Sequence, residues 1–196
     1  MGNKNVKNFI VLLTVALVIV ACFAYLSNRT KSAEEGSQTL TAVQEVLTRD
    51  LSTNYPPTPK EVLKYYSEIT RCFYSEEYSD EELAELADQA LKLLDDELKA
   101  NQSETDYMEK LKSDIASYKE EGRTISSYSV ASSANVKYYD YEGSQWAMLN
   151  CVYSLKEKGT ISPTKEEFLL RKDESGRWKI FGWRIIEDED DTDAEE

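Results

Sequence analysis

An uninterrupted apolar run near the start of the chain constrains its fold more than any other feature. Residues 9–26 read FIVLLTVALVIVACFAYL, eighteen residues without one charged side chain. At a rise of 1.5 Å per residue such a helix spans about 27 Å, close to the hydrocarbon thickness of a bilayer, about 30 Å. A helix buried in a soluble domain would show a polar face, and this run shows none. The sequence therefore predicts a transmembrane helix over 9–26, after a short basic N-terminus over 1–8.

Two interpretations of this run remain open, an uncleaved signal anchor and a lipoprotein signal. The second rests on Cys22, because the preceding Ile-Val-Ala resembles the motif that directs lipidation of a cysteine. Residues 23–26 prolong the apolar run past the cleavage point, where a mature lipoprotein usually turns polar, and a cysteine inside an apolar helix is an ordinary small hydrophobe. We favour the anchor and keep Cys22 as a candidate lipidation residue.

The orientation of the predicted helix follows from its flanks. Lys4 and Lys7 precede the run and Arg29 and Lys31 follow it, so a count of basic residues alone gives a tie. A short basic start ahead of an apolar run is typical of export signals. We therefore expect a single-pass protein of the cell membrane that contacts the lipid bilayer through 9–26, with the C-terminal domain extracytoplasmic.

The composition of the remainder excludes several classes of function. The chain carries a net charge of −14, and all 37 acidic residues lie beyond residue 26, which disfavours nucleic acid as a partner. The sequence contains no histidine, the side chain used most often as a general base and metal ligand. We expect no cofactor, no metal site and no identifiable catalytic set. Cys72 and Cys151 could form a disulfide or stay as two buried thiols, and the sequence leaves both alternatives open.

Beyond the apolar run the chain divides into three parts: a tether with a short amphipathic segment over 27–56, a domain over 57–186, and an acidic tail over 187–196 that we expect to be disordered. Three helix starts are marked by capping residues. They are Thr58 before Pro59, Ser79 with Glu82, and Ser103. The second helix carries an apolar stripe that runs from Leu83 to Leu98, and Gly122 suits the end of the third.

After residue 122 the apolar pattern changes from helical spacing to alternation, which predicts strands. The expected strands are 125–132, 136–141, 146–155, 165–171 and 177–186. Both faces of the strand over 146–155 are apolar, so we expect both to be covered. Helices followed by an antiparallel meander predict an α+β domain with about three helices packed on a curved sheet of four to five strands.

This order of elements, closing with GRWKIFGWRI, resembles the cone-like fold of the nuclear-transport-factor-2-like superfamily, which includes ketosteroid isomerases. The resemblance covers residues 57–186 and implies a pocket between the helices and the sheet. The whole chain, including NYPPTPKEVLKYY, is also similar to an uncharacterised family of membrane-anchored proteins from gut clostridia. That similarity implies location and fold, and no activity.

The function expected from these observations is a membrane-tethered binding or interaction module for a small molecule or protein. Tyr66, Tyr138 and Trp146 are candidates for lining its pocket, since aromatic residues with a polar tip suit pockets and interfaces. One alternative is a small enzyme that uses carboxylate and tyrosine chemistry, for which Asp140 is the nearest acid, although Asp is ordinary beside a turn. The other is a structural domain associated with the cell envelope.

Overall fold

The structure, a computed structural model, describes residues 40–101 and 103–186. The chain forms two compact units, and all the described residues except Leu40 belong to the second, Thr41–Glu196. The predicted membrane helix over 9–26 and the acidic tail lie outside the described residues. Within the described part of the chain, no helix is both long enough and apolar enough to cross a membrane.

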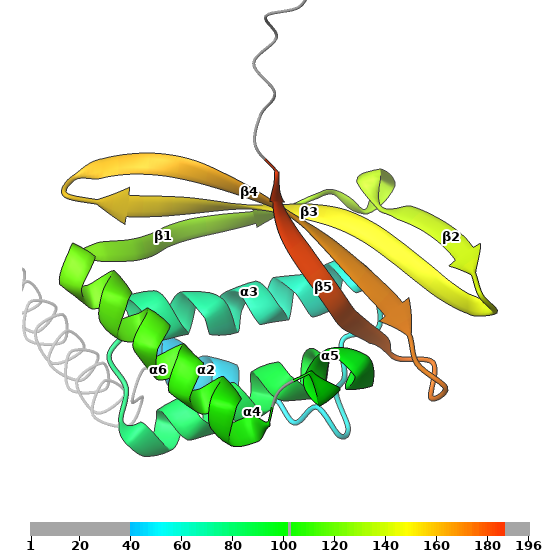
Figure 1. Cartoon of the computed structure of the whole chain (residues 1–196), viewed down its shortest axis with the longest axis horizontal. Helices are drawn as coiled ribbons and strands as arrows, with labels where there is room; N and C mark the ends of the chain where they lie inside the picture. The colour runs from blue at the N-terminus through cyan, green and yellow to red at the C-terminus, as the bar shows by residue number, and fades with distance from the viewer. Residues whose placement is uncertain (1–39, 102, 187–196) are drawn as a thin grey trace, which may run out of the picture. The chain divides into compact units, whose positions relative to one another are not determined.

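The described part of the second unit is an α+β domain in which five α-helices precede the sheet along the chain. Figure 1 shows these helices on one side of the sheet. The helices are α2 (Ala42–Leu47), α3 (Pro59–Ser75), α4 (Asp80–Leu93), α5 (Asp96–Ala100) and α6 (Glu104–Glu121). The three predicted N-caps are confirmed: the side chains of Thr58, Ser79 and Ser103 accept hydrogen bonds from the first turns of α3, α4 and α6. Gly122 ends α6 with φ +64°, a conformation that glycine adopts without strain.

The sequence pattern was wrong about the second helix, which does not continue to Leu98. The helix stops at Leu93 because the chain leaves it to pair with the sheet: Leu94 forms a parallel bridge with Ile180, and the Asp95 N–H donates to the Ile180 carbonyl (2.8 Å). Asp95 then caps the short helix α5 by accepting from the Glu97 N–H. Apolar spacing alone cannot reveal such a break, because the leucines on both sides of it remain buried or partly buried.

The strands form one antiparallel sheet around the long strand β3. They are β1 (Arg123–Val130), β2 (Lys137–Tyr141), β3 (Ser144–Glu157), β4 (Thr160–Lys172) and β5 (Trp178–Ile186). The order is β1-β3-β4-β5, and β2 pairs with the other half of the β3 edge that β1 occupies. β4 begins five residues before the predicted start at Lys165, because Lys158 and Gly159, both at positive φ, make a tight hairpin turn.

One face of the sheet packs on the helices, and α3 lies across it (Figure 1). The alternate residues of β3 from Ala147 to Tyr153 point to this face and are buried. Phe168 and Leu170 of β4 and Ile180 of β5 join them, each 0% exposed. Side chains therefore fill the space between α3 and the sheet, and burial of these apolar groups is the main source of stability.

The other face, called the outer face below, carries no helix among the described residues, so the expectation that both faces of β3 are covered was wrong. Trp146 is on this face and is nonetheless only 8% exposed. The rings of Phe181 (5.0 Å between centroids) and Tyr141 (6.5 Å) and the Arg171 guanidinium (5.5 Å) cover it. A large ring can thus be buried by neighbouring side chains on an otherwise open sheet surface.

A charged pair ties α5 to the outer face of the sheet. Arg171 on β4 donates to both carboxylate oxygens of Asp95, at 2.6 and 3.0 Å, and to Glu97 at 2.8 Å. Asp95 is 3% exposed, so the bidentate ion pair with Arg171 has to compensate the charge of its buried carboxylate.

Replacing Arg171 should therefore destabilise the domain more than replacing another arginine whose ion pair has the same length. We expect Arg171→Met to lower the free energy of unfolding by about 3 kcal/mol, because it leaves the Asp95 carboxylate buried without a counter-charge. The control is Arg184→Met. Arg184 pairs with Glu167 at 2.6 Å, but its side chain is 75% exposed, so the loss should be less than about 1 kcal/mol. Equal losses in urea denaturation of the two variants would contradict the structural role of the buried pair.

Candidate functional site

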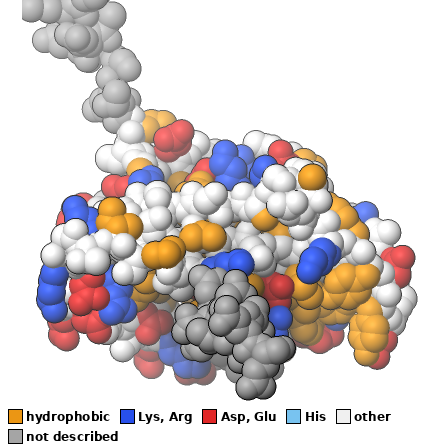
Figure 2. Space-filling model, turned by 90° about the horizontal axis from the view of Figure 1, so that it is seen from above, with side chains coloured by type: hydrophobic (Ala, Val, Ile, Leu, Met, Phe, Trp, Pro, Cys, Tyr) orange, Lys and Arg blue, Asp and Glu red, His pale blue; other side chains and the backbone are white. Residues whose placement is uncertain are grey.

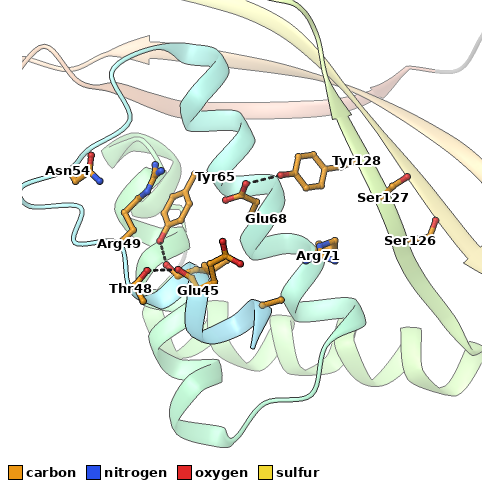
Figure 3. Close-up of a pocket in the computed structure, with 12 residues that line it drawn as sticks. Glu45, Thr48, Arg49, Asn54, Tyr65, Glu68, Arg71, Ser126, Ser127 and Tyr128 are labelled. Carbon is orange, nitrogen blue, oxygen red and sulfur yellow. Dashed lines mark hydrogen bonds between the residues drawn. The ribbon is translucent and has the colours of Figure 1, made fainter. Parts of the chain in front are cut away.

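A cleft of about 690 Å³ opens between α2, the residues that follow it, α3 and β1. Figure 3 shows its lining side chains, which come from three parts of the sequence. They are Ala42, Glu45, Val46, Thr48, Arg49 and Asn54; Tyr65, Glu68 and Arg71; and Ser126, Ser127 and Tyr128. The cleft is lateral: it lies beside the edge of the sheet and not in the filled space between α3 and the strands.

Two tyrosines fix the walls of this cleft. The Tyr65 hydroxyl donates to the Val46 carbonyl oxygen (2.9 Å) and ties α3 to α2, while the Arg49 guanidinium lies 4.6 Å from the centre of the Tyr65 ring. The Tyr128 hydroxyl on β1 donates to the Glu68 carboxylate on α3 (3.0 Å), as Figure 3 shows. Burial raises the pKa of Tyr128, and the charge of Glu68 raises it further, so this hydroxyl stays a proton donor. These two hydrogen bonds fix the positions of α2 and β1 relative to α3, and thereby the walls of the cleft.

The charged groups of the cleft balance. Glu45 and Glu68 face Arg49 and Arg71, and Arg71 also pairs with Glu76 at the rim (3.3 Å). Exposed hydroxyl groups of Ser126 and Ser127 lie on the β1 side. Such a lining offers donors and acceptors of both signs, and it does not select a strongly anionic or strongly cationic ligand.

Beside this cleft, β1 presents a free backbone edge, because β1 pairs only with β3 among the described strands. At its start the edge is closed: the Ser75 hydroxyl accepts from the Ile125 N–H (2.8 Å) and donates to the Ile125 carbonyl (2.9 Å). A bulge follows at Ser126. Beyond it, residues 127–130 contain no charge and no proline, the two devices that proteins use most to block strand edges.

The direction of the free backbone groups follows from the pairing. The Ala131 N–H donates to the Asn150 carbonyl (2.9 Å), so Ala131 and Asn150 form a hydrogen-bonded pair at the end of the β1–β3 ladder. In an antiparallel ladder hydrogen-bonded and non-hydrogen-bonded pairs alternate. The register therefore turns the backbone groups of Ser129 toward β3 and those of Tyr128 and Val130 away from it, toward the side of the cleft.

The other described edges of the sheet are protected. On β5 the Leu94–Asp95 segment covers the edge at Ile180. The part of β4 that extends past β5 contains Pro163, and β2 is only five residues long with charges at Lys137 and Asp140. Residues 127–130 of β1 thus lack the covering segment, the proline and the charges found on these other edges, and they lie beside the cleft of about 690 Å³.

Of the three predicted pocket residues, two come together and the third lies apart from them. Tyr138 and Trp146 line a smaller hollow of about 360 Å³ with Trp178, at the end of the sheet that carries β2. Tyr66 lies elsewhere, on α3, where its ring packs against Phe168 and Trp183 at 6.1 and 6.0 Å. Asp140, the nearest acid to a catalytic candidate in the sequence, is exposed on β2 and lies at the rim of the smaller hollow.

The helix-facing side of the sheet carries one acid that sequence reasoning missed. Glu166 on β4 pairs in register with Cys151 and with Ile185, and no hydrogen bond or ion pair to its carboxylate is present among the described residues. Burial raises the pKa of Glu166 and is the sole cause of that shift. Glu166 in turn contributes to the raised pKa of Tyr66, whose main cause is burial. In the sequence Glu166 is hidden because it is one of two adjacent glutamates, and only the strand register shows which one faces the helices.

The two cysteines of the domain are buried free thiols, which decides between the alternatives left open by the sequence. Burial raises the pKa of Cys72 to about 11 and raises that of Cys151 as well. Ser67, also fully buried, contacts Cys151 (3.5 Å) and the Tyr153 hydroxyl (2.9 Å). Protonated, inaccessible thiols are poor nucleophiles, so this polar group in the core satisfies its own hydrogen bonds and offers no reactive site.

Among residues 40–101 and 103–186 no group of three or more Cys, Asp and Glu side chains is placed to hold a metal ion. The acidic stretch around Ser79 serves as a capping box instead, since Ser79 accepts from the Glu82 N–H and the Glu82 carboxylate accepts from the Ser79 N–H.

The family described as "Domain of unknown function (DUF6715)" matches residues 1–183, which include the apolar run over 9–26. No curated protein matches the chain.

The burial of Glu166 predicts a pH-dependent effect on stability. Because the pKa of Glu166 is raised in the folded state, the protonated carboxyl contributes to stability. That contribution is fully present below the pKa of the unfolded chain, near 4.5, and is lost as the pH rises through the pKa of the folded chain. We expect Glu166→Gln to raise the melting temperature at pH 7 and to lose this advantage as the pH falls toward 4. Glu167→Gln is the control: it removes the ion pair with Arg184 on the outer face and should bring no gain at pH 7. A Glu166→Gln variant less stable than the native chain at pH 7 would show that its charge is compensated.

Proposed function

We propose, from the premise that the chain belongs to this family of unknown function, that it is a membrane-tethered, extracytoplasmic binding module. In this proposal residues 9–26 insert in the bilayer as a signal anchor, and the domain binds an extended peptide of a partner protein. The apolar run and its basic start support the placement, and the family match includes that run.

The free edge of β1 beside the cleft carries the proposal. An extended peptide can add to an exposed strand edge as a further strand, with its backbone bound by the sheet and alternate side chains held by the adjoining groove. Here the outward backbone groups of Tyr128 and Val130 would bind the peptide backbone. The cleft between α2, α3 and β1 would take every second side chain.

The lining of the cleft supports a peptide with side chains of mixed character. Arg71 and Arg49 can bind a carboxylate or carbonyl oxygen, and Glu45 can bind an amide or a basic side chain. Glu68 is already engaged by Tyr128, so it orients the wall and contributes less to recognition. Specificity in this proposal comes from the placement of both charges, and affinity comes from the backbone of β1.

The order of helices followed by an antiparallel meander also supports a cone-like fold of the nuclear-transport-factor-2-like kind. In such a fold the pocket implied by the resemblance lies between the helices and the sheet. In this chain Phe168, Leu170 and Ile180 occupy that space and are fully buried. This filling favours the lateral cleft over the interior of the cone as the binding site.

A second candidate function, an enzyme using carboxylate and tyrosine chemistry, is favoured by one observation. Glu166 combines a raised pKa with the absence of a hydrogen-bonding partner among the described residues, and Tyr66 lies within its electrostatic reach. A substrate would reach Glu166 and Tyr66 by passing Trp183 and Ile185, whose side chains are 47% and 64% exposed. The peptide-binding proposal stands first because the β1 cleft is open, whereas Tyr66 sits in a packed aromatic cluster.

Strand addition can be tested with a displayed library of random linear twelve-residue peptides, selected on the full chain in neutral detergent. We expect enriched peptides whose binding to the protein falls about tenfold or more on the variant Val130→Pro, because proline removes an outward N–H. A thermal melt of the variant confirms that it is folded. N-methylation of alternate peptide amides provides a second measurement on the unaltered protein: one register of methylation should abolish binding and the other should leave it intact.

The matched control is Ile161→Pro, which places a second proline on the free edge of β4 near Pro163, away from the cleft. It should leave peptide binding unchanged. Peptides that bind Val130→Pro and the native chain equally, with no dependence on amide methylation, would exclude β1 as the docking strand, and so would the absence of any enriched peptide.

Membrane placement predicts the outcome of protease treatment of intact cells. We expect protease added outside the cell to release the domain. The N-terminal peptide left in the membrane should have the mass calculated from its sequence, with no attached lipid. The variant Cys22→Ala should behave in the same way if 9–26 is an uncleaved anchor, whereas a lipoprotein would lose its attached lipid and its membrane retention. A domain protected in intact cells and cleaved only after lysis would contradict the extracytoplasmic placement.

A further inference from the structure

The outer face of the sheet is basic in a chain that is acidic overall. Every second residue of β3 from Trp146 to Lys156 points to this face. The residues of β2, β4 and β5 that stand opposite them in the strand register point to it as well. Its charged members are six cations and one carboxylate: Lys137, Lys156, Lys165, Arg171, Lys179, Arg184 and Glu167. The chain as a whole carries −14, so the sign of this face is opposite to that of the remainder.

Three of these cations are available for a partner. Arg171 is engaged by Asp95 and Glu97, and Arg184 is engaged by Glu167. The Lys179 ammonium donates to the Lys92 carbonyl oxygen at the end of α4 (2.6 Å). Lys137, Lys156 and Lys165 make no ion pair within the described part of the chain. They lie on β2, β3 and β4, so they are spread across the face and do not form a point-like site.

The end of the face that carries β2 is apolar and aromatic. Tyr139 and Tyr141 are 40% and 57% exposed, and they flank the ring of Trp146. Figure 2 looks onto this face and shows hydrophobic side chains gathered toward the end that carries β2, with Lys and Arg side chains among them. A surface of this kind suits an extended acidic segment, because the cations hold its carboxylates and the rings pack against its backbone.

The chain itself supplies such a segment where β5 ends. Ile186, the last residue of β5, pairs in register with Lys165, so the tail is attached to the sheet next to that lysine. The tail over 187–196 reads EDEDDTDAEE and carries eight acids in ten residues. Ten residues reach about 33 Å when extended, and strands lie about 4.8 Å apart, so the tail is long enough to reach β3 and β2.

We propose that the acidic tail over 187–196 lies back across the outer face of the sheet and neutralises Lys165, Lys156 and Lys137. The tail is then an internal occupant of this face, and an acidic partner of the face would have to displace it.

The charges favour this occupant over a second copy of the chain. Two outer faces brought together would place like charges opposite each other, with no carboxylate besides Glu167 to compensate them. A tail of the same chain is held near the face at an effective concentration in the millimolar range, so weak individual contacts suffice. The proposal is independent of strand addition at β1, because the cleft is beside β1 and faces the helices.

Zero-length carbodiimide crosslinking, which joins a lysine to a carboxylate in contact with it, tests the proposal on the full chain in neutral detergent. We expect mass spectrometry to find Lys165, Lys156 or Lys137 joined to carboxylates of 187–196 at low salt. These links should be lost near 1 M salt, where charges are screened beyond about 3 Å. A mixture of isotopically light and heavy chains shows whether a link is within one chain. Links only between chains, or only to lysines of the helices, would overturn the proposal.

A competition experiment gives an independent readout. The probe is the synthetic peptide EDEDDTDAEE, and the receptor is the full chain in which every Asp of 187–196 is changed to Asn and every Glu to Gln. We expect the peptide to bind this variant about tenfold more tightly than it binds the native chain, whose own tail competes. Binding should fall about tenfold when Lys137→Gln, Lys156→Gln and Lys165→Gln are added. The matched triple Lys60→Gln, Lys64→Gln and Lys112→Gln, on α3 and α6, should leave it unchanged.

Equal binding to the two triple variants would assign the peptide to another surface, and equal binding to native and tail-neutralised chains would show that the tail does not occupy the face. Each of these outcomes overturns the proposal. Melting temperatures of all variants establish that the comparison is made between folded chains.

Discussion

The fold depends on β3, the strand with which β1, β2 and β4 all pair. Its fourteen residues present a continuous buried row to α3, from Ala147 to Tyr153, and a mixed row to the opposite side. Because side chains alternate along a strand, this one segment sets both which side carries the helices and which side stays open. A shift of register by one residue would place Asn150 in the core and expose Cys151, and such a shift is strongly disfavoured where one face is buried.

The two surfaces with functional promise are consequences of that arrangement. β1 and β2 share one edge of β3, so β1 ends where β2 begins to pair, and no other described strand pairs with the outer edge of β1. α2 and α3 border this edge without covering it, which produces the cleft. On the other side, the helices all lie against one face, so the outer face keeps its lysines and rings in contact with solvent (Figure 1).

The sequence predicted those features well that depend on contacts between residues close together in the chain. Caps such as Ser79 with Glu82 act within one turn, and the left-handed residue Gly122 needs no partner, so both were readable from the sequence and are confirmed. Features that depend on distant contacts were missed. The break at Leu94 exists because Ile180 takes over its pairing, and the cleft exists because residues near 45, 68 and 127 meet in space. The uncharged stretch over 127–130 was a readable signal of an open edge, but its meaning requires knowing that β1 has no second neighbouring strand in the described part of the chain.

The charge distribution explains how one small domain could keep two open surfaces without self-association. Open strand edges and exposed aromatic faces both promote contact between copies. A net charge of −14 opposes such contact at long range, but it does so least over the outer face, where the local sign is positive. An acidic tail that covers this face would restore repulsion where the rest of the molecule lacks it. The edge of β1 gains no such protection from the adjoining cleft, because Arg49 and Arg71 balance Glu45 and Glu68 there. At that edge only the net charge of the whole chain opposes contact between copies, so a peptide that carries little charge of its own meets a smaller barrier than a second copy does.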